Sequence, residues 1–156
     1  MPTGNFGDIF AGYIAKRMGL PIADLVVATN QNDILHRCLS GQGYHKGGVT
    51  PSISPSMDIQ VSSNFERALF DAYDRDAGAV AQLMNELGQG GFDVSQGAMQ
   101  ALQDTYRPGR ASDDETTATI ADRRRPTGEL LCRHSPVRGK GADDSPHPAP
   151  PMVPPA

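Results

Sequence analysis

The chain has 156 residues, which is enough for one domain with a modest hydrophobic core. Its 18 acidic and 14 basic residues give a formal net charge of −4, whereas a dedicated nucleic-acid binder normally shows a basic surface. No apolar run approaches the roughly eighteen residues of a membrane-spanning helix and no signal segment opens the chain, so we expect a cytoplasmic protein without nucleic-acid or membrane partners.

The chain opens on a glycine-rich turn that runs directly into an amphipathic helix. Gly4, Asn5 and Gly7 can turn the backbone sharply, and glycine lets an anion approach the backbone closely. The first N–H groups of a helix lack partners and its dipole favours negative charge there, so the pattern predicts a phosphate site. An ordinary turn with an N-cap is the alternative. The helix is predicted from apolar residues spaced with a period of about 3.6, namely Ile9, Phe10, Tyr13, Ile14 and Met18.

A strand and a second helix follow the stop signal at residues 19–21. The run Leu25–Thr29 is short and rich in β-branched residues, which favours a buried strand of a parallel sheet. Helix–strand–helix order is half of a doubly wound α/β unit, in which ligands bind beyond the carboxyl ends of the strands. Polar residues occupy that place, namely Thr29, Asn30, Asn32 and Asp33. The stretch Asn30–Asp33 is also expected to cap the next helix. One face of that helix is apolar, with Ile34, Leu35, Cys38 and Leu39.

Residues 40–56 are predicted to form a loop, because glycine and proline recur throughout them. Ser63 and Glu66 then match a capping box, which opens a helix with Phe65, Leu69 and Tyr73 on one stripe. Two more helices are predicted over residues 77–87 and 95–105. Their inward side chains are Val80, Leu83, Met84, Leu87, Met99 and Leu102. A second capping box, Ser112–Glu115, opens a last helix.

The composition changes near residue 123. Arg123–Pro126 is expected to end the last helix, and the residues beyond it are rich in proline and arginine. Such a segment cannot bury enough apolar surface to offset its chain entropy. We therefore divide the chain into an α/β part, residues 1–122, and a disordered tail, residues 123–156. Cys38 and Cys132 lie far apart without metal-ligand spacing, so we expect free thiols and no metal site.

Three stretches together resemble threonine synthase. They are Pro2–Gly12 (PTGNFGDIFAG), Ala28–Leu35 (ATNQNDIL) and Ser54–Arg67 (SPSMDIQVSSNFER), in that order. The resemblance extends to about residue 122 and thins in the tail. It implies an α/β fold that is mostly helical with few strands, a fragment of a pyridoxal-phosphate enzyme of fold type II, the tryptophan-synthase-β-like class.

The resemblance also implies a reaction and a cofactor site. Threonine synthases are lyases of threonine biosynthesis that convert O-phospho-L-homoserine and water into L-threonine and phosphate. Gly4, Asn5, Phe6 and Gly7 would hold the phosphate of pyridoxal 5'-phosphate, in agreement with the anion site predicted above. Ser135 would stand beside the pyridine nitrogen. The carboxylates Asp33 and Asp58 could contact the substrate or could only orient loops.

The lysine that forms a Schiff base with the cofactor has no counterpart in this sequence. In the family it lies in a Phe-Lys-Asp segment of the N-terminal half. The chain contains Lys16, Lys46 and Lys140, none in that context. A lysine amine is needed to anchor the cofactor aldehyde and to move protons. We therefore expect a C-terminal portion of the enzyme that is inactive alone, with a separate N-terminal half as a possible partner.

Two other interpretations stay open at this point. The chain could be a non-catalytic protein that binds a phosphate or a partner with this half of the fold. It could also be the product of a decayed or frameshifted gene. The second interpretation comes from the tail, where Arg133, Pro136 and Arg138 replace residues of the family's Pro-His-Thr-Ala-Val-Gly segment around Ser135.

Overall fold

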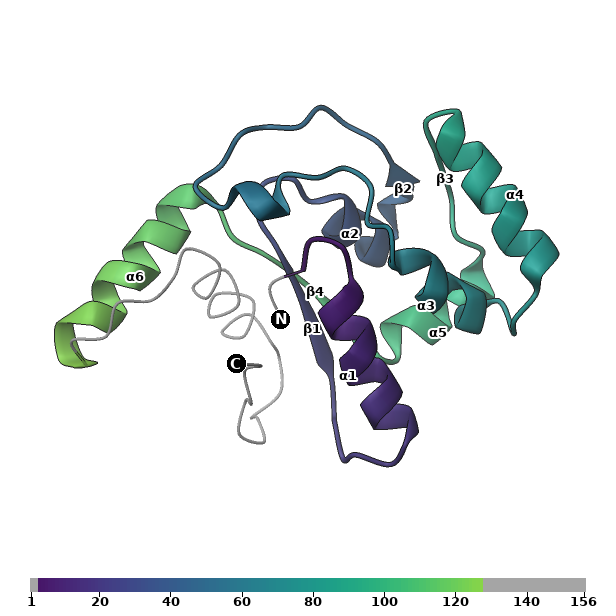
Figure 1. Cartoon of the computed structure of the whole chain (residues 1–156), viewed down its shortest axis with the longest axis horizontal. Coiled ribbons are helices and arrows are strands. Elements are labelled where there is room, and N and C mark those ends of the chain that lie inside the picture. The colour runs from purple at the N-terminus through teal and green to yellow at the C-terminus, as the bar shows by residue number, and fades with distance from the viewer. Residues whose placement is uncertain (1–2, 128–156) are drawn as a thin grey trace.

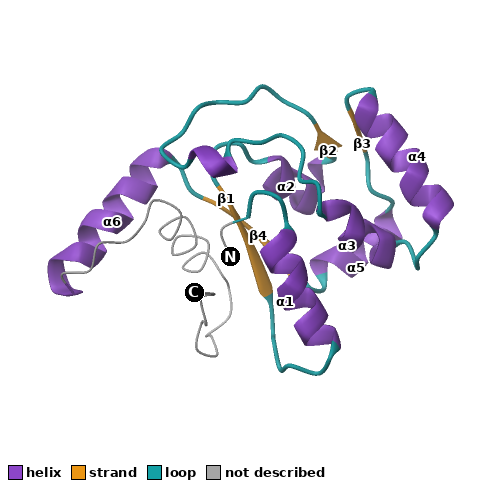
Figure 2. Ribbon diagram, in the orientation of Figure 1, coloured by secondary structure: helices purple, strands orange, loops and turns teal. Residues whose placement is uncertain are grey.

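The computed structural model describes residues 3–127, with the side chains of residues 3–122 (Figure 1). Helices outnumber strands, as Figure 2 shows, and the α/β class with few strands is confirmed. In chain order the elements, with two short helical turns η1 and η2, are α1 (Gly7–Arg17), β1 (Leu25–Thr29), α2 (Ile34–Arg37), η1 (Cys38–Gln42), β2 (Tyr44–His45), η2 (Pro55–Met57), α3 (Phe65–Ala72), α4 (Ala77–Gly88), β3 (Gly91–Phe92), α5 (Gln96–Gln103), β4 (Tyr106–Arg110) and α6 (Asp113–Thr127).

The strands β1 and β4 form a parallel pair at the centre of the fold. Their register aligns Leu25 with Tyr106 and Thr29 with Arg110. The predicted strand Leu25–Thr29 is confirmed to the residue. The strand β4 was not predicted, because Pro108 and the glycine after it are poor strand formers. Proline is tolerated there since, in the described sheet, β4 pairs only with β1 and so lies at an edge.

A second, two-residue pairing joins β2 to β3 in antiparallel fashion. Tyr44 lies opposite Phe92, and their ring centroids are 5.1 Å apart. Glycine is required at position 91, because a Cβ there would stand 2.5 Å from the Cα of His45. The prediction of a loop throughout residues 40–56 was therefore wrong at Tyr44–His45. Strands of two residues carry no periodic signal, and this one exists because its partner packs against it.

One hydrophobic core lies between the parallel pair and the helices α1, α2, α3 and α5. The predicted inner faces are confirmed for α2 and η1, where Ile34, Leu35, Cys38 and Leu39 are all buried. Phe65 and Leu69 of α3 and Leu102 of α5 are buried as well. Burying each such side chain contributes about 1.5–3 kcal/mol. Two residues expected to point inward from α4, Val80 and Met84, are only half-buried.

The helix caps differ from their prediction in two of three cases. The box at Ser112 and Glu115 is confirmed: the Ser112 N–H donates to Glu115 Oε2 at 2.9 Å, and the Glu115 N–H donates to Ser112 Oγ at 3.2 Å. The box at Ser63 and Glu66 is wrong, because α3 begins at Phe65 without a side-chain cap. Asp33 precedes α2 and likewise makes no cap hydrogen bond.

The last helix, α6, leads away from the sheet on the side opposite to α3, α4 and α5 (Figure 1). It continues to Thr127, the residue directly after the stretch Arg123–Pro126 that was expected to end it. Consequently the expected tail begins inside this helix, and residues 128–156 lie outside the described part of the chain. No helix in the described part is long and apolar enough to span a membrane.

Candidate functional site

The glycine-rich turn lies at the carboxyl end of β1, as the doubly wound order predicts. The N–H of Thr3 donates to the carbonyl of Ala28 at 2.7 Å, so the residues entering the turn run beside the strand. The turn then delivers the chain to Gly7, the first residue of α1. In open α/β sheets this edge is where ligands bind.

Several N–H groups of the turn have no protein acceptor. The first hydrogen bond of α1 runs from the N–H of Phe10 to the carbonyl of Phe6, at 3.0 Å. No side chain caps this helix. Within the described part of the chain, the N–H groups of Phe6, Gly7, Asp8 and Ile9 are therefore unpaired. Four free donors at the positive end of a helix dipole fit a phosphate dianion.

Phe6 contributes its backbone to this turn and its side chain to the core. It adopts a left-handed conformation, with φ of 66°, which is uncommon for a residue other than glycine. Its ring lies edge-on to Phe65 and to Tyr106, with both centroid distances 5.1 Å, and it is 1% exposed. The packed ring holds the backbone in this conformation. The ring belongs to the core, so Phe6 offers the turn its backbone groups, and cofactor binding by Phe6 stays a prediction.

The two glycines of the turn have different surroundings. A Cβ at Gly4 would stand 3.1 Å from the carbonyl oxygen of Ser56, which is tighter than an ordinary contact. A Cβ at Gly7 would meet Asn64 Nδ2 at 3.5 Å, an ordinary van der Waals distance. Gly4 is thus needed by the protein's own packing, while the space around Gly7 is open. Asp8 is exposed in the first turn of α1, where its negative charge would repel a bound anion.

Asp58 is the centre of a hydrogen-bond network beside the turn. Its Oδ1 accepts from Asn30 Nδ2 (2.7 Å), Asn32 Nδ2 (2.9 Å) and Ser52 Oγ (2.6 Å), and its Oδ2 accepts from the Ser52 N–H (2.8 Å). Burial would raise the pKa of this carboxyl, but the hydrogen bonds from Ser52, Asn30 and Asn32 outweigh it and lower the pKa overall. These hydrogen bonds let Asp58 orient the loop at residue 52, and a contact to substrate stays a prediction.

Asp33 also has protein partners. Its Oδ1 accepts from Arg37 Nε at 3.0 Å, one turn further along the chain, and its Oδ2 lies 3.3 Å from Arg110 Nη1 on β4. The carboxylate therefore ties α2 to the edge of the sheet. Like Asp58, it holds structure together rather than facing open space.

The two lysines in the described part are engaged away from the turn. Lys16 lies in the last turn of α1, roughly 14 Å along the helix axis from Gly7. Its Nζ donates to the carbonyl of Ala23 at 2.7 Å. Lys46 follows β2, and no hydrogen bond among the described residues joins it to residues 4–7. Lys140 and the predicted cofactor residue Ser135 lie outside the described residues.

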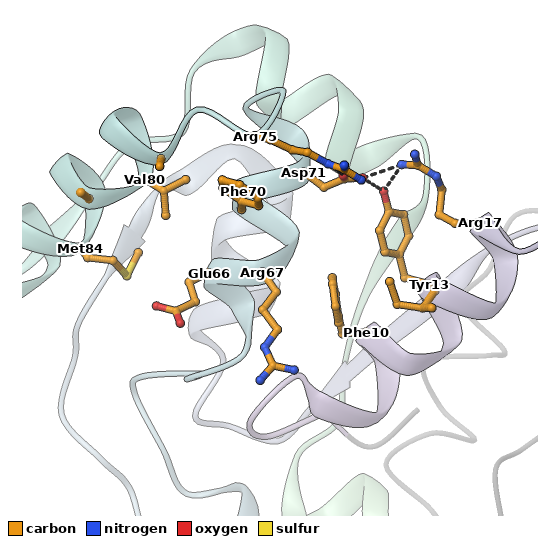
Figure 3. A pocket seen from close by; sticks show the side chains of 13 residues that line it. Phe10, Tyr13, Arg17, Glu66, Arg67, Phe70, Asp71, Arg75, Val80 and Met84 are labelled. Carbon is orange, nitrogen blue, oxygen red and sulfur yellow. Dashed lines mark hydrogen bonds and ion pairs between the residues drawn. The ribbon is translucent and has the colours of Figure 1, made fainter.

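A second hollow, the helical groove, lies between α1, α3 and α4 and has a volume of about 760 Å³. Figure 3 shows the side chains that line it. One end is closed by Asp71, which accepts hydrogen bonds from Tyr13 Oη and, at 2.5 Å, from Arg17 Nη1. Sequence analysis missed this groove, because its apolar members look like ordinary core positions: Phe10, Ile14, Phe70, Val80 and Met84.

Comparison with known proteins gives consistent results. The chain is 49% identical over 143 residues to threonine synthase of Pseudomonas aeruginosa, covering 91% of this chain. It superimposes on a crystal structure of pyridoxal-phosphate-bound threonine synthase from Brucella melitensis with a TM-score of 0.91 and 53% identity, over 94% of this chain. The chain is related to the threonine synthases. Yeast threonine synthase also matches, with a TM-score of 0.86 and 36% identity over 91% of this chain.

This relative of the threonine synthases covers only part of each protein it matches. It spans 30% of the Pseudomonas enzyme, 32% of the Brucella chain and 31% of the yeast chain. No family model matches it. The predicted likeness to part of a threonine synthase is thus confirmed, while the activity of a complete enzyme belongs to the proposal below.

Proposed function

We propose that this chain forms the cofactor-phosphate part of a threonine synthase, in which residues 4–7 hold the phosphate of pyridoxal 5'-phosphate. The assembled enzyme would convert O-phospho-L-homoserine and water into L-threonine and phosphate. The relatives support this proposal, since one of them binds pyridoxal phosphate in its crystal structure. Bound pyridoxal phosphate would supply an electron sink for the substrate's reacting carbon.

The observation that carries the proposal is the set of unpaired N–H groups at the start of α1. A dianion at this point would accept hydrogen bonds from backbone groups that otherwise face water. Gly7 and Asp8 are exposed, and the left-handed turn at Phe6 and the open space around Gly7 leave their N–H groups accessible. Every helix begins with unpaired donors, but these lie beside the carboxyl end of β1, where ligands bind in open α/β sheets.

We further propose that catalysis needs a lysine from another polypeptide segment. Lys16 is held at the far end of α1, and neither Lys46 nor Lys140 stands in the sequence context of the family's Schiff-base lysine. The chain alone would then bind the cofactor through its phosphate without processing the substrate.

Binding to the full-length chain tests the site. Titrating it with pyridoxal phosphate and, separately, with pyridoxal measures how much the phosphate contributes to affinity. We expect pyridoxal phosphate to bind at least about tenfold more tightly than pyridoxal, and inorganic phosphate to compete. Equal dissociation constants for the two compounds would contradict the proposal.

An activity measurement tests the role of the missing lysine. Full-length chain, pyridoxal phosphate and O-phosphohomoserine are mixed, and released phosphate is measured. We expect no release above the rate without protein. Release at a rate proportional to the protein concentration would overturn the claim that another segment supplies the lysine, but it would leave the cofactor site in place.

A further inference from the structure

Two of the three residues that precede α3, Ser62 and Asn64, hold the backbone of the glycine-rich turn. Ser62 Oγ donates to the carbonyl of Gly4 at 2.7 Å. Asn64 donates twice to the carbonyl of Asn5, through its N–H and through Nδ2, both at 3.0 Å. Two successive carbonyls of the turn are thus fixed toward this segment.

Fixing these carbonyls also fixes the direction of two N–H groups. In a planar trans peptide the C=O and the N–H point in opposite directions. The carbonyl of Gly4 shares its peptide with the N–H of Asn5, and the carbonyl of Asn5 shares its peptide with the N–H of Phe6. Both N–H groups therefore face away from Ser62 and Asn64, toward the side where an anion would be bound.

Ser62 is itself held rigidly. It is buried, and its N–H donates to the hydroxyl of Tyr44 at 2.8 Å. The ring of Tyr44 packs between Phe65 and Phe92, with centroid distances of 5.1 Å to each. The turn is thereby connected through Ser62 to the best-packed aromatic residues of the core.

The ordinary role of serine and asparagine at this point in a chain is to cap the following helix. None of these side chains does so, since α3 has no side-chain cap hydrogen bond. Their hydrogen bonds go instead to residues 58 or 59 positions away in the sequence. This departure from local chemistry indicates that the contacts to the turn are what these residues supply.

We propose that Ser62 and Asn64 are positioning residues, which hold the N–H groups of residues 5 and 6 in the orientation that a cofactor phosphate needs. This inference rests on the proposed function, because it assigns a purpose to the donors of the same site. It places the determinants of phosphate affinity in a segment that does not contact the anion.

The experiment compares single variants of the full-length chain. Asn64→Ala is the main variant, because Asn64 is only half-buried and the fold should tolerate the change. Ser63→Ala is the matched control: Ser63 is exposed, and its contact to Asn5 Oδ1 is long, at 3.4 Å. Ser62→Ala is added with thermal unfolding as a check of its fold. Dissociation constants are measured for pyridoxal phosphate and for pyridoxal.

We expect Asn64→Ala and Ser62→Ala to weaken pyridoxal-phosphate binding by about threefold to tenfold while leaving pyridoxal binding unchanged. Ser63→Ala should stay within about twofold of the unaltered chain. Equal affinities for Asn64→Ala and Ser63→Ala would overturn the inference, as would a parallel loss for pyridoxal.

Amide resonances in NMR spectra distinguish a failure of this inference from a failure of the proposed function. If the unaltered chain shows no preference for pyridoxal phosphate, the proposed function fails. The positioning role is then judged by the amide resonances of residues 5–7 in NMR spectra of the full-length chain. Asn64→Ala should shift them and Ser63→Ala should not; unchanged resonances in Asn64→Ala would refute positioning whatever the ligand.

Discussion

Two regions beside α1 are built in opposite ways. The polar edge consists of the glycine-rich turn, residues 4–7, and the hydrogen-bond network around Asp58, and the other region is the helical groove. At the polar edge, Asn30 and Asn32 are 2% and 4% exposed, and both donate to the carboxylate of Asp58. In the groove, Ile14 and Phe70 are 43% and 38% exposed. The buried polar side chains of the first region find partners within the described chain, whereas the second region leaves apolar surface open.

The difference follows from what each kind of group tolerates. A buried amide or carboxylate without a partner costs roughly 1–3 kcal/mol, so the chain must satisfy these groups itself. An exposed apolar side chain lacks only the stabilisation that burial would have contributed, and folded proteins expose many apolar atoms. A chain that spans about a third of the length of its relatives can therefore satisfy the buried side chains of its polar edge and still have an open groove.

Removing the central acceptor should break the polar edge most strongly. Asp58→Asn replaces one carboxylate oxygen with an NH2 group, so that a donor faces either the Ser52 N–H at Oδ2 or the three side-chain donors at Oδ1. We expect a loss of about 2–3 kcal/mol in the free energy of unfolding, measured by urea denaturation. Asp104→Asn, at the exposed residue that follows α5, should change it by less than about 0.5 kcal/mol. Equal effects would mean that the network contributes nothing.

The same variant has a defined pH dependence. The pKa of Asp58 is lowered in the folded chain, so its carboxylate stabilises the fold at pH values above the unfolded-state pKa of about 3.9. This contribution is lost as the pH falls through the folded-state value. The stability difference between the unaltered chain and Asp58→Asn should therefore be constant from about pH 5 to 7 and shrink below about pH 4.

Two buried tyrosine hydroxyls provide the next comparison. Tyr44 Oη accepts from the Ser62 N–H, whereas Tyr106 Oη has no hydrogen-bond partner among the described residues. Tyr44→Phe should cost about 1–2 kcal/mol, because a buried N–H loses its acceptor. Tyr106→Phe should be neutral or stabilising by up to about 1 kcal/mol. Thermal unfolding of both variants measures these changes in stability. A large loss of stability in Tyr106→Phe would reveal an unrecognised hydrogen-bond partner of the Tyr106 hydroxyl.

Substitutions at the two glycines of the turn distinguish a role in protein packing from a role in leaving space for the ligand. Gly4→Ala forces a Cβ to within 3.1 Å of the Ser56 carbonyl and should cost about 1 kcal/mol of stability. Gly7→Ala meets only Asn64 Nδ2 at 3.5 Å and should leave stability unchanged. If Gly7→Ala still weakens pyridoxal-phosphate binding, the open space around Gly7 belongs to the ligand. A less stable Gly7→Ala than Gly4→Ala would contradict this assignment.

The smallest effect is expected from the one acidic residue in the first turn of α1. Asp8→Asn removes a negative charge that opposes a bound phosphate. Pyridoxal-phosphate affinity should rise about twofold to fivefold at low salt, and the gain should shrink as ionic strength increases. An unchanged or lower affinity would argue that the phosphate does not sit at this helix end.

The sequence by itself determined what depends on neighbouring residues. The strand Leu25–Thr29, the apolar faces of α2 and α3 and the capping box at Ser112 were all predictable, because hydrophobic period and capping chemistry act over a few positions. The glycine-rich turn before α1 was predictable for the same reason: glycines and a helix start are adjacent in the chain.

Only the tertiary structure decided the features whose partners are distant. The strand β4 forms because β1 lies beside it, about eighty positions away in register. Phe6 takes a left-handed backbone because Phe65 and Tyr106 hold its ring. Ser62 and Asn64 direct their side chains to the carbonyls of Gly4 and Asn5 and make no cap hydrogen bond to α3. In each case a long-range contact outweighs a local preference of about 1 kcal/mol, and no pattern along the chain records which contact will win.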